Sequence, residues 1–123
     1  MLQEKLTSRI VLAAINVHRE LGPGLLESVY EVCLIAELED SGLEVKRQVP
    51  LPISYRGKSI ENGLRLDLLI ENSVVVELKA VESLLPIHQA QLLSYLKLSN
   101  KRIGLLLNFN VELLKDGLVR MVN

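Results

Sequence analysis

Two neighbouring apolar segments of the sequence carry charged residues at positions that a buried strand usually fills with apolar side chains. Residues 74–81 read V-V-V-E-L-K-A-V, with Glu77 and Lys79 two positions apart, and the preceding apolar segment, L-R-L-D-L-L-I, contains Asp67. Burying an ionised carboxylate or ammonium is costly unless the group is paired or binds a metal ion. The sequence therefore favours a divalent-metal site built from these residues.

The spacing of these residues predicts that they face one another across a β-hairpin. Residues 71–73, E-N-S, are the only turn-forming segment between the two apolar segments. With a three-residue loop, Asp67 lies opposite Glu77, with Cβ atoms roughly 5 Å apart. Because side chains alternate along a strand, Lys79 projects on the same face as Glu77. A two-residue loop would instead place Asp67 opposite Leu78, on the wrong face.

Two carboxylates and a lysine in this arrangement are the minimum set for metal-assisted hydrolysis of a phosphodiester bond. The carboxylates would hold a hard divalent cation, Mg²⁺ or Mn²⁺, which neutralises charge on the phosphate and lowers the pKa of a bound water. The lysine could orient that water or stabilise charge in the transition state. The spacing D-x(9)-E-x-K also occurs by chance in many proteins, so it is the location of these residues in apolar strands that favours a metal site.

Length and composition predict one small domain, residues 1–123. The net charge is −1 with both signs interspersed, so there is no general basic field for nucleic acid and any such binding must be local. The single cysteine, Cys33, excludes an intramolecular disulfide and is expected in the core. No uninterrupted apolar segment approaches the roughly 20 residues of a membrane span. We therefore expect a soluble, cytoplasmic protein without a membrane partner.

The hydrophobic pattern predicts helices and strands in an order that is typical of an α/β fold. Two helices come first and are separated by Gly22-Pro23-Gly24, and a third helix begins at Pro86. The strands should form a mixed sheet between helical layers, with residues 102–109 central because they are apolar on both faces. The expected helices cover residues 4–21, 26–41 and 86–99, and the expected strands cover residues 45–55, a short partner from Lys58 after the turn Arg56-Gly57, the two hairpin strands, 102–109 and 118–122.

Several segments together resemble a known protein family. Residues 24–30, G-L-L-E-S-V-Y, resemble the GxxExxY signature that names a prokaryotic family, and the resemblance extends over nearly the whole chain. That family is assigned to the PD-(D/E)XK nuclease superfamily. The resemblance thus implies a restriction-endonuclease-like core, a mixed central β-sheet flanked by helices, and metal-dependent nuclease activity on DNA. The other similar segments are R-L-D-L-L-I-E-N, V-V-V-E-L-K-A-V-E, H-Q-A-Q-L-L-S-Y-L-K and G-L-L-L-N-F-N.

The resemblance also implies roles for individual residues. Asp67 and Glu77 would bind the metal and Lys79 would be the catalytic lysine, in agreement with the argument from the residues alone. Glu27 matches a helical acid that joins the metal site in several branches, often through water. It could equally be a first-turn glutamate that the helix N-terminus stabilises. Tyr30 completes the signature, and its hydroxyl could hold Glu27 or another group of the site, although an aromatic residue on an apolar helix face is more often part of the core.

Three further residues are candidates for binding substrate. Gln91 and Tyr95 match the QxxxY motif of RecB-like and lambda-exonuclease-like branches, where these side chains help to position substrate. Residues four apart share a helix face, so both could point toward Lys79, or Tyr95 could only pack on its neighbours. Arg65 lies on the same strand face as Asp67 and could contact a phosphate, although an arginine at a strand end is usually solvated or part of a salt bridge.

Three interpretations of the charged residues compete. The first is a Mg²⁺- or Mn²⁺-dependent deoxyribonuclease, and the second is a non-catalytic nuclease-fold module that binds nucleic acid or a protein partner. The third is purely structural, with a buried Glu77–Lys79 ion pair and Asp67 bonded to Arg65. A core of this length offers little surface for a duplex, so either a homodimer builds the groove or the affinity is low. The intact set of acids and lysine favours the enzyme.

Overall fold

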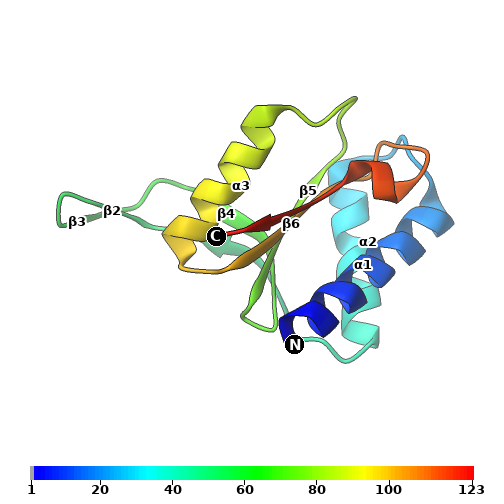
Figure 1. Cartoon of the computed structure of the whole chain (residues 1–123), viewed down its shortest axis with the longest axis horizontal. Helices are drawn as coiled ribbons and strands as arrows, with labels where there is room; N and C mark the ends of the chain where they lie inside the picture. The colour runs from blue at the N-terminus through cyan, green and yellow to red at the C-terminus, as the bar shows by residue number, and fades with distance from the viewer. Residues whose placement is uncertain (1) are drawn as a thin grey trace.

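A five-stranded mixed β-sheet forms the centre of the computed structural model, which describes residues 2–123. The strand order is β1-β4-β5-β6-β7, in which β5 and β6 are parallel and the other neighbours are antiparallel. Two helices cover one face of the sheet and α3 covers the other (Figure 1). The α/β fold predicted from the sequence is confirmed. The elements are α1 (Leu2–Leu21), α2 (Glu27–Asp40), β1 (Val45–Pro50), β2 (Ile53–Tyr55), β3 (Lys58–Ile60), β4 (Arg65–Ile70), β5 (Val74–Lys79), α3 (Pro86–Ser99), β6 (Ile103–Asn108), the 3₁₀ helix η1 (Leu114–Gly117) and β7 (Leu118–Val122).

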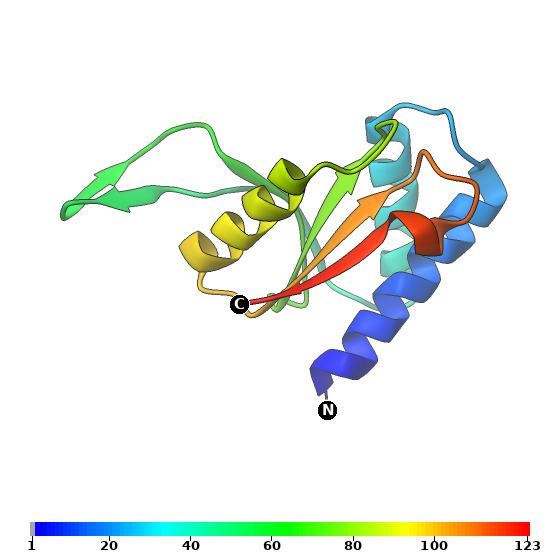
Figure 2. The same cartoon turned by 45° about the horizontal axis from the view of Figure 1, so that its top comes forward.

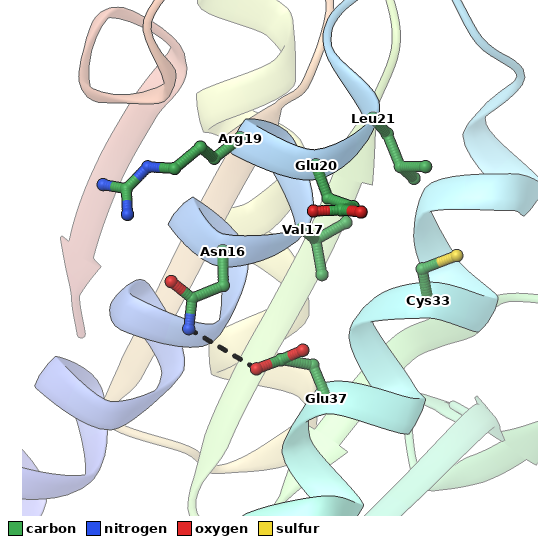
Figure 3. A pocket seen from close by; sticks show the side chains of 7 residues that line it. All are labelled: Asn16, Val17, Arg19, Glu20, Leu21, Cys33 and Glu37. Carbon is green, nitrogen blue, oxygen red and sulfur yellow. Dashed lines mark hydrogen bonds between the residues drawn. The ribbon is translucent and has the colours of Figure 1, made fainter.

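The α1–α2 pair forms the layer on one face of the sheet. Its apolar residues join the larger core cluster, which includes Val76 and Leu78 of β5. Asn16 of α1 also donates a hydrogen bond to Glu37 of α2, across 3.4 Å (Figure 3). Asn16 and Glu37 line a pocket between the two helices, and Cys33 lines it too (Figure 3). Cys33 also packs against the core, as the sequence predicted. These contacts fix the position of α2, which carries Glu27 at its first turn.

The opposite face of the sheet packs against α3. Leu92 and Leu96 of α3 are fully buried in a second cluster, together with Val75 of β5. Because side chains alternate along β5, Glu77 and Lys79 lie on the same face as Val75 and project toward α3. Every residue of β6 is buried, which confirms the central strand expected from its apolar sequence.

Residues 45–55 form two strands in two different sheets, so the prediction of one continuous strand was wrong. β1 ends at Pro50, and the chain then leaves the central sheet and forms β2, which pairs with β3 in a separate two-stranded sheet. Proline has no backbone N–H, so Pro52 cannot extend the ladder of hydrogen bonds. The expected turn at Arg56-Gly57 is confirmed. Residues 51–64, hereafter the arm, project from the body of the molecule (Figure 2).

Candidate functional site

The β4–β5 hairpin has the register that the sequence predicted. Its loop consists of residues 71–73, and the last regular pair before the open end of the hairpin is Leu68 with Val76. The next position on each strand is Asp67 on β4 and Glu77 on β5. These two residues therefore face each other, as expected from the three-residue loop.

At this point the two carboxylates replace hydrogen bonds between the strand backbones. The Asp67 N–H donates to Glu77 Oε2 at 2.8 Å, and the Leu78 N–H donates to Asp67 Oδ2 at 2.9 Å. Each carboxylate thus reaches across to the opposite strand, where a backbone donor fixes one of its oxygens. Asp67 Oδ1 and Glu77 Oε1 take no part in these two hydrogen bonds.

Burial, and then the charge of a neighbouring acid, raises the pKa of both carboxylates. Glu77 is only 4% exposed, and burial, followed by the charge of Asp67, raises its pKa from the ordinary 4.5 to about 8. Burial is also the largest cause of the raised pKa of Asp67, to which the charge of Glu31 adds. Lys79 and the backbone donors oppose both increases. At neutral pH the metal-free site therefore retains a proton, which a bound cation would displace.

Lys79 is connected to α3 by a short chain of hydrogen bonds. Its Nζ donates to Gln91 Oε1 at 3.4 Å, and Gln91 Nε2 donates to the Tyr95 hydroxyl at 3.2 Å. Tyr95 is also part of the core beneath α3, and the negative charges of Glu77 and Asp67 contribute to raising its pKa, after burial. The expectation that Gln91 and Tyr95 point toward Lys79 is thus confirmed, and Tyr95 has the packing role as well.

Glu27 begins α2 beside the carboxylates of the hairpin. Its pKa is raised by burial and then by the charge of Asp67, while Lys79 lowers it. The Tyr30 hydroxyl makes its hydrogen bonds elsewhere: it donates to Gly22 O at 2.6 Å and accepts from the Leu25 N–H at 3.1 Å. The idea that this hydroxyl holds Glu27 was therefore wrong. Tyr30 instead fixes the loop that leads into the first turn of α2.

Comparison with known proteins identifies the family. A family model described as the PD-(D/E)XK nuclease superfamily matches residues 4–121. The chain belongs to the PD-(D/E)XK nuclease superfamily. No curated protein and no solved structure matched the chain. Within residues 2–123, no helix is long and apolar enough to cross a membrane.

The donor set of this superfamily member suits a hard cation, although it is not a closed cage. Among the described residues, no group of three or more His, Cys, Asp or Glu side chains converges closely enough to hold a metal ion. Glu27 therefore does not complete a direct three-carboxylate site with Asp67 and Glu77. Mg²⁺ is usually held by one or two carboxylates together with water and substrate phosphate, so Asp67 and Glu77 fit this requirement.

Gln48 is a site residue that the sequence analysis missed. The pairs on either side of it, Arg47 with Leu68 and Val49 with Leu66, place it opposite Asp67. Its backbone has φ +49°, a left-handed conformation that is costly for a residue with a Cβ atom. A hydrogen bond from its side chain lowers the pKa of Asp67. Gln48 on β1 and Glu77 on β5 thus flank Asp67, which lies on the strand between them.

Glu31 was also missed, although its spacing offered a signal. It lies four residues after Glu27 and therefore on the same face of α2. The residue is 6% exposed, and its carboxylate accepts hydrogen bonds from Gln48 Nε2 at 3.2 and 3.4 Å and lies 3.2 Å from the guanidinium of Arg47. A buried acid with these partners, next to Asp67, adds a further negative charge to the site.

The structural interpretation based on two ion pairs was wrong. In the described part of the chain, Lys79 is hydrogen-bonded to Gln91 instead of Glu77, and Arg65 Nη1 donates to the backbone oxygen of Leu64 at 3.3 Å. Arg65 is exposed, as expected for an arginine at a strand end. Asp67, Glu77 and Lys79 are therefore not paired with one another or with Arg65, and a cation or a phosphate can neutralise their charges.

Glu77 makes the stability of the metal-free protein fall as the pH rises. Between its unfolded pKa of 4.5 and its native pKa of about 8, the native state binds more protons than the unfolded state. The free energy of unfolding should then fall with pH, by at most about 1.4 kcal/mol per unit from this group. Urea unfolding in EDTA from pH 5.5 to 8.5 should show this fall, and Glu77→Gln should make it shallower. Glu61→Gln on the exposed arm is the control, and an equal slope in Glu77→Gln would contradict the assignment.

Substitution of Gln48 should separate backbone strain from side-chain support. Gln48→Gly and Gln48→Ala both remove the amide, so both should weaken manganese binding at pH 7 relative to the native protein. Only glycine adopts a left-handed conformation without cost, so the glycine variant should be the more stable of the two by about 1–2 kcal/mol. Urea unfolding measures this difference. Equal stabilities would mean that residue 48 does not retain the left-handed backbone.

Proposed function

We propose that the protein is a Mg²⁺- or Mn²⁺-dependent nuclease that hydrolyses phosphodiester bonds in DNA. The observation that carries this proposal is the arrangement of Asp67 and Glu77, which face each other and are each fixed through one oxygen. Lys79 projects on the same face and is held by Gln91. Membership of the superfamily supports the reaction class, and the resemblance at residues 24–30 supports the narrower assignment to the GxxExxY family.

The carboxylates and the lysine divide the chemistry between them. Asp67 and Glu77 hold the cation, which when bound neutralises charge on the phosphate and lowers the pKa of a water. Glu27 adds a negative charge beside Asp67 and contributes to cation binding through water. The Lys79 ammonium orients the attacking water and stabilises the charge that develops on the phosphate.

The remaining residues bind substrate. The side chains of Gln91 and Tyr95 lie beside Lys79, so their polar atoms can position the phosphate that is cleaved. Arg65 is exposed two residues before Asp67 and can contact a neighbouring phosphate. A nuclease-fold module that binds DNA without cleaving it would use the same surface, and the cleavage assay below separates the two functions.

DNA cleavage should depend on Lys79, and metal binding should not depend on it. With Mg²⁺ and duplex DNA, Lys79→Met should reduce the cleavage rate by roughly 100-fold or more, a typical cost of removing a charge-stabilising group from an active site. Its affinity for manganese should change little, because Lys79 is not a ligand. Lys97→Met, at an exposed position of α3, is the matched control. Equal rates in Lys79→Met and the native protein would contradict the proposed role, and DNA binding without cleavage would favour the binding module.

A further inference from the structure

The arm has a fixed base and an exposed tip. At the base, the Leu51 N–H donates to Leu64 O at 3.0 Å, and Leu51 is buried in the core cluster beneath α3. Asn62 accepts from the Leu64 N–H at 2.7 Å and donates to Ile60 O at 3.0 Å, which fixes the return strand. Beyond this base, the two strands extend away from the body of the molecule in both views (Figures 1 and 2). The direction of the arm is thus set by the body while its surface stays accessible.

The arm contributes little to the stability of the fold. Every residue of β2 and β3 is exposed except Ile53, which is half-buried. Tyr55 is 56% exposed and Ile60 is 41% exposed. These strands therefore bury almost no surface. An isolated two-stranded hairpin is also marginally stable in water at best. The chemistry of the arm is therefore better explained by a partner than by the core.

The tip of the arm is basic despite a conformational cost. Tyr55 pairs with Lys58, so Arg56 and Gly57 form a two-residue turn, with φ +50° and +78°. Such turns favour Asn or Gly at the first position because that residue has a left-handed backbone. Arg56 thus occupies a position that the turn geometry alone would fill with Asn or Gly. The Arg56 guanidinium lies over the Tyr55 ring, 5.5 Å from its centroid, and Glu61, the acidic residue of the arm, lies nearer the base.

The arm leaves the sheet at the end that holds the candidate site. β4 is antiparallel to β5, so the start of β4 at Arg65 lies beside the end of β5 at Lys79. Asp67 follows Arg65 by two residues. The seven steps along the chain from Lys58 to Arg65 span at most about 23 Å in an extended strand, about the length of seven base pairs. The tip could therefore contact the same DNA molecule as the site.

We propose that the arm grips double-stranded DNA, with Arg56 and Lys58 contacting backbone phosphates several base pairs from the cleaved bond. The choice of DNA rests on the proposed function. A two-stranded β-ribbon fits the major groove of B-form DNA, whereas the major groove of A-form RNA is too narrow and deep. The register pairs Tyr55 with Lys58 on one face of the ribbon and Ser54 with Ser59 on the other, so the face that carries Lys58 is the one turned toward the DNA.

Salt-dependent binding tests this inference without relying on catalysis. The probe is a fluorescent 24-base-pair DNA duplex, and the anisotropy titration is done in EDTA so that neither cleavage nor metal binding contributes. Each phosphate contact adds about 0.9 to the slope of log affinity against log salt concentration. Arg56→Ala/Lys58→Ala should therefore reduce the slope by about 1.8. The fold-loss of affinity between 50 and 200 mM salt should then be roughly tenfold smaller than for the native protein. Because both residues are exposed, the melting temperature should not change.

The matched control removes one lysine and one arginine at the other end of the sheet. Lys5→Ala/Arg102→Ala changes the net charge equally, and both residues are exposed. It should leave the slope unchanged. Equal slopes for the native protein and the arm variant, equal losses in the two variants, or no duplex binding by the native protein would overturn the inference. Equal arm-dependent binding of a single strand would also overturn it. Unchanged manganese affinity in Asp67→Ala with none of these results would count against the proposed function alone.

Discussion

The hydrogen bonds that Asp67 and Glu77 make across the β4–β5 hairpin are the interaction on which the site depends. They replace the backbone ladder at the open end of the hairpin and hold two carboxylates on facing strands. A hydrogen bond contributes roughly 0.5–1.5 kcal/mol between neutral groups and roughly 1.5–3 kcal/mol to a charged group, which helps to offset the cost of burial. Burial and mutual repulsion still raise the pKa of Glu77 to about 8. A divalent cation would relieve both effects.

The rest of the fold keeps this hairpin in place. Parallel pairing with buried β6 fixes β5 up to Lys79, which is opposite Asn108. The Asn108 side chain accepts from the Val81 N–H at 3.0 Å and donates to Val81 O at 2.9 Å, so it also holds the chain beyond the strand. On the other face, stacking of Tyr30 on Phe109, with ring centroids 4.6 Å apart, anchors the start of α2. The site thus lies between elements that are each fixed independently.

The sequence predicted the part of the site that depends on local spacing. The register of the hairpin followed from one turn segment, residues 71–73. The shared direction of the Gln91 and Tyr95 side chains followed from their spacing of four residues on a helix. The break in residues 45–55 was missed because alternation continues across Pro50 and Pro52 while the strand pairing changes. The left-handed backbone of Gln48 has no local signature, because it arises where β1 passes Asp67. These two features are set by strand pairing far along the chain and have no local signal in the sequence.

Calorimetric titration of manganese into the native protein and Asp67→Ala tests the central claim most directly. The control is Asp116→Ala, at an exposed position of η1. The convergence of Asp67 and Glu77 predicts that the native protein and the control bind manganese and that Asp67→Ala does not. Binding at pH 7 should also release a proton from Glu77, seen as a dependence of the heat on the buffer. Unchanged manganese affinity in Asp67→Ala, or no binding by the native protein, would contradict the account.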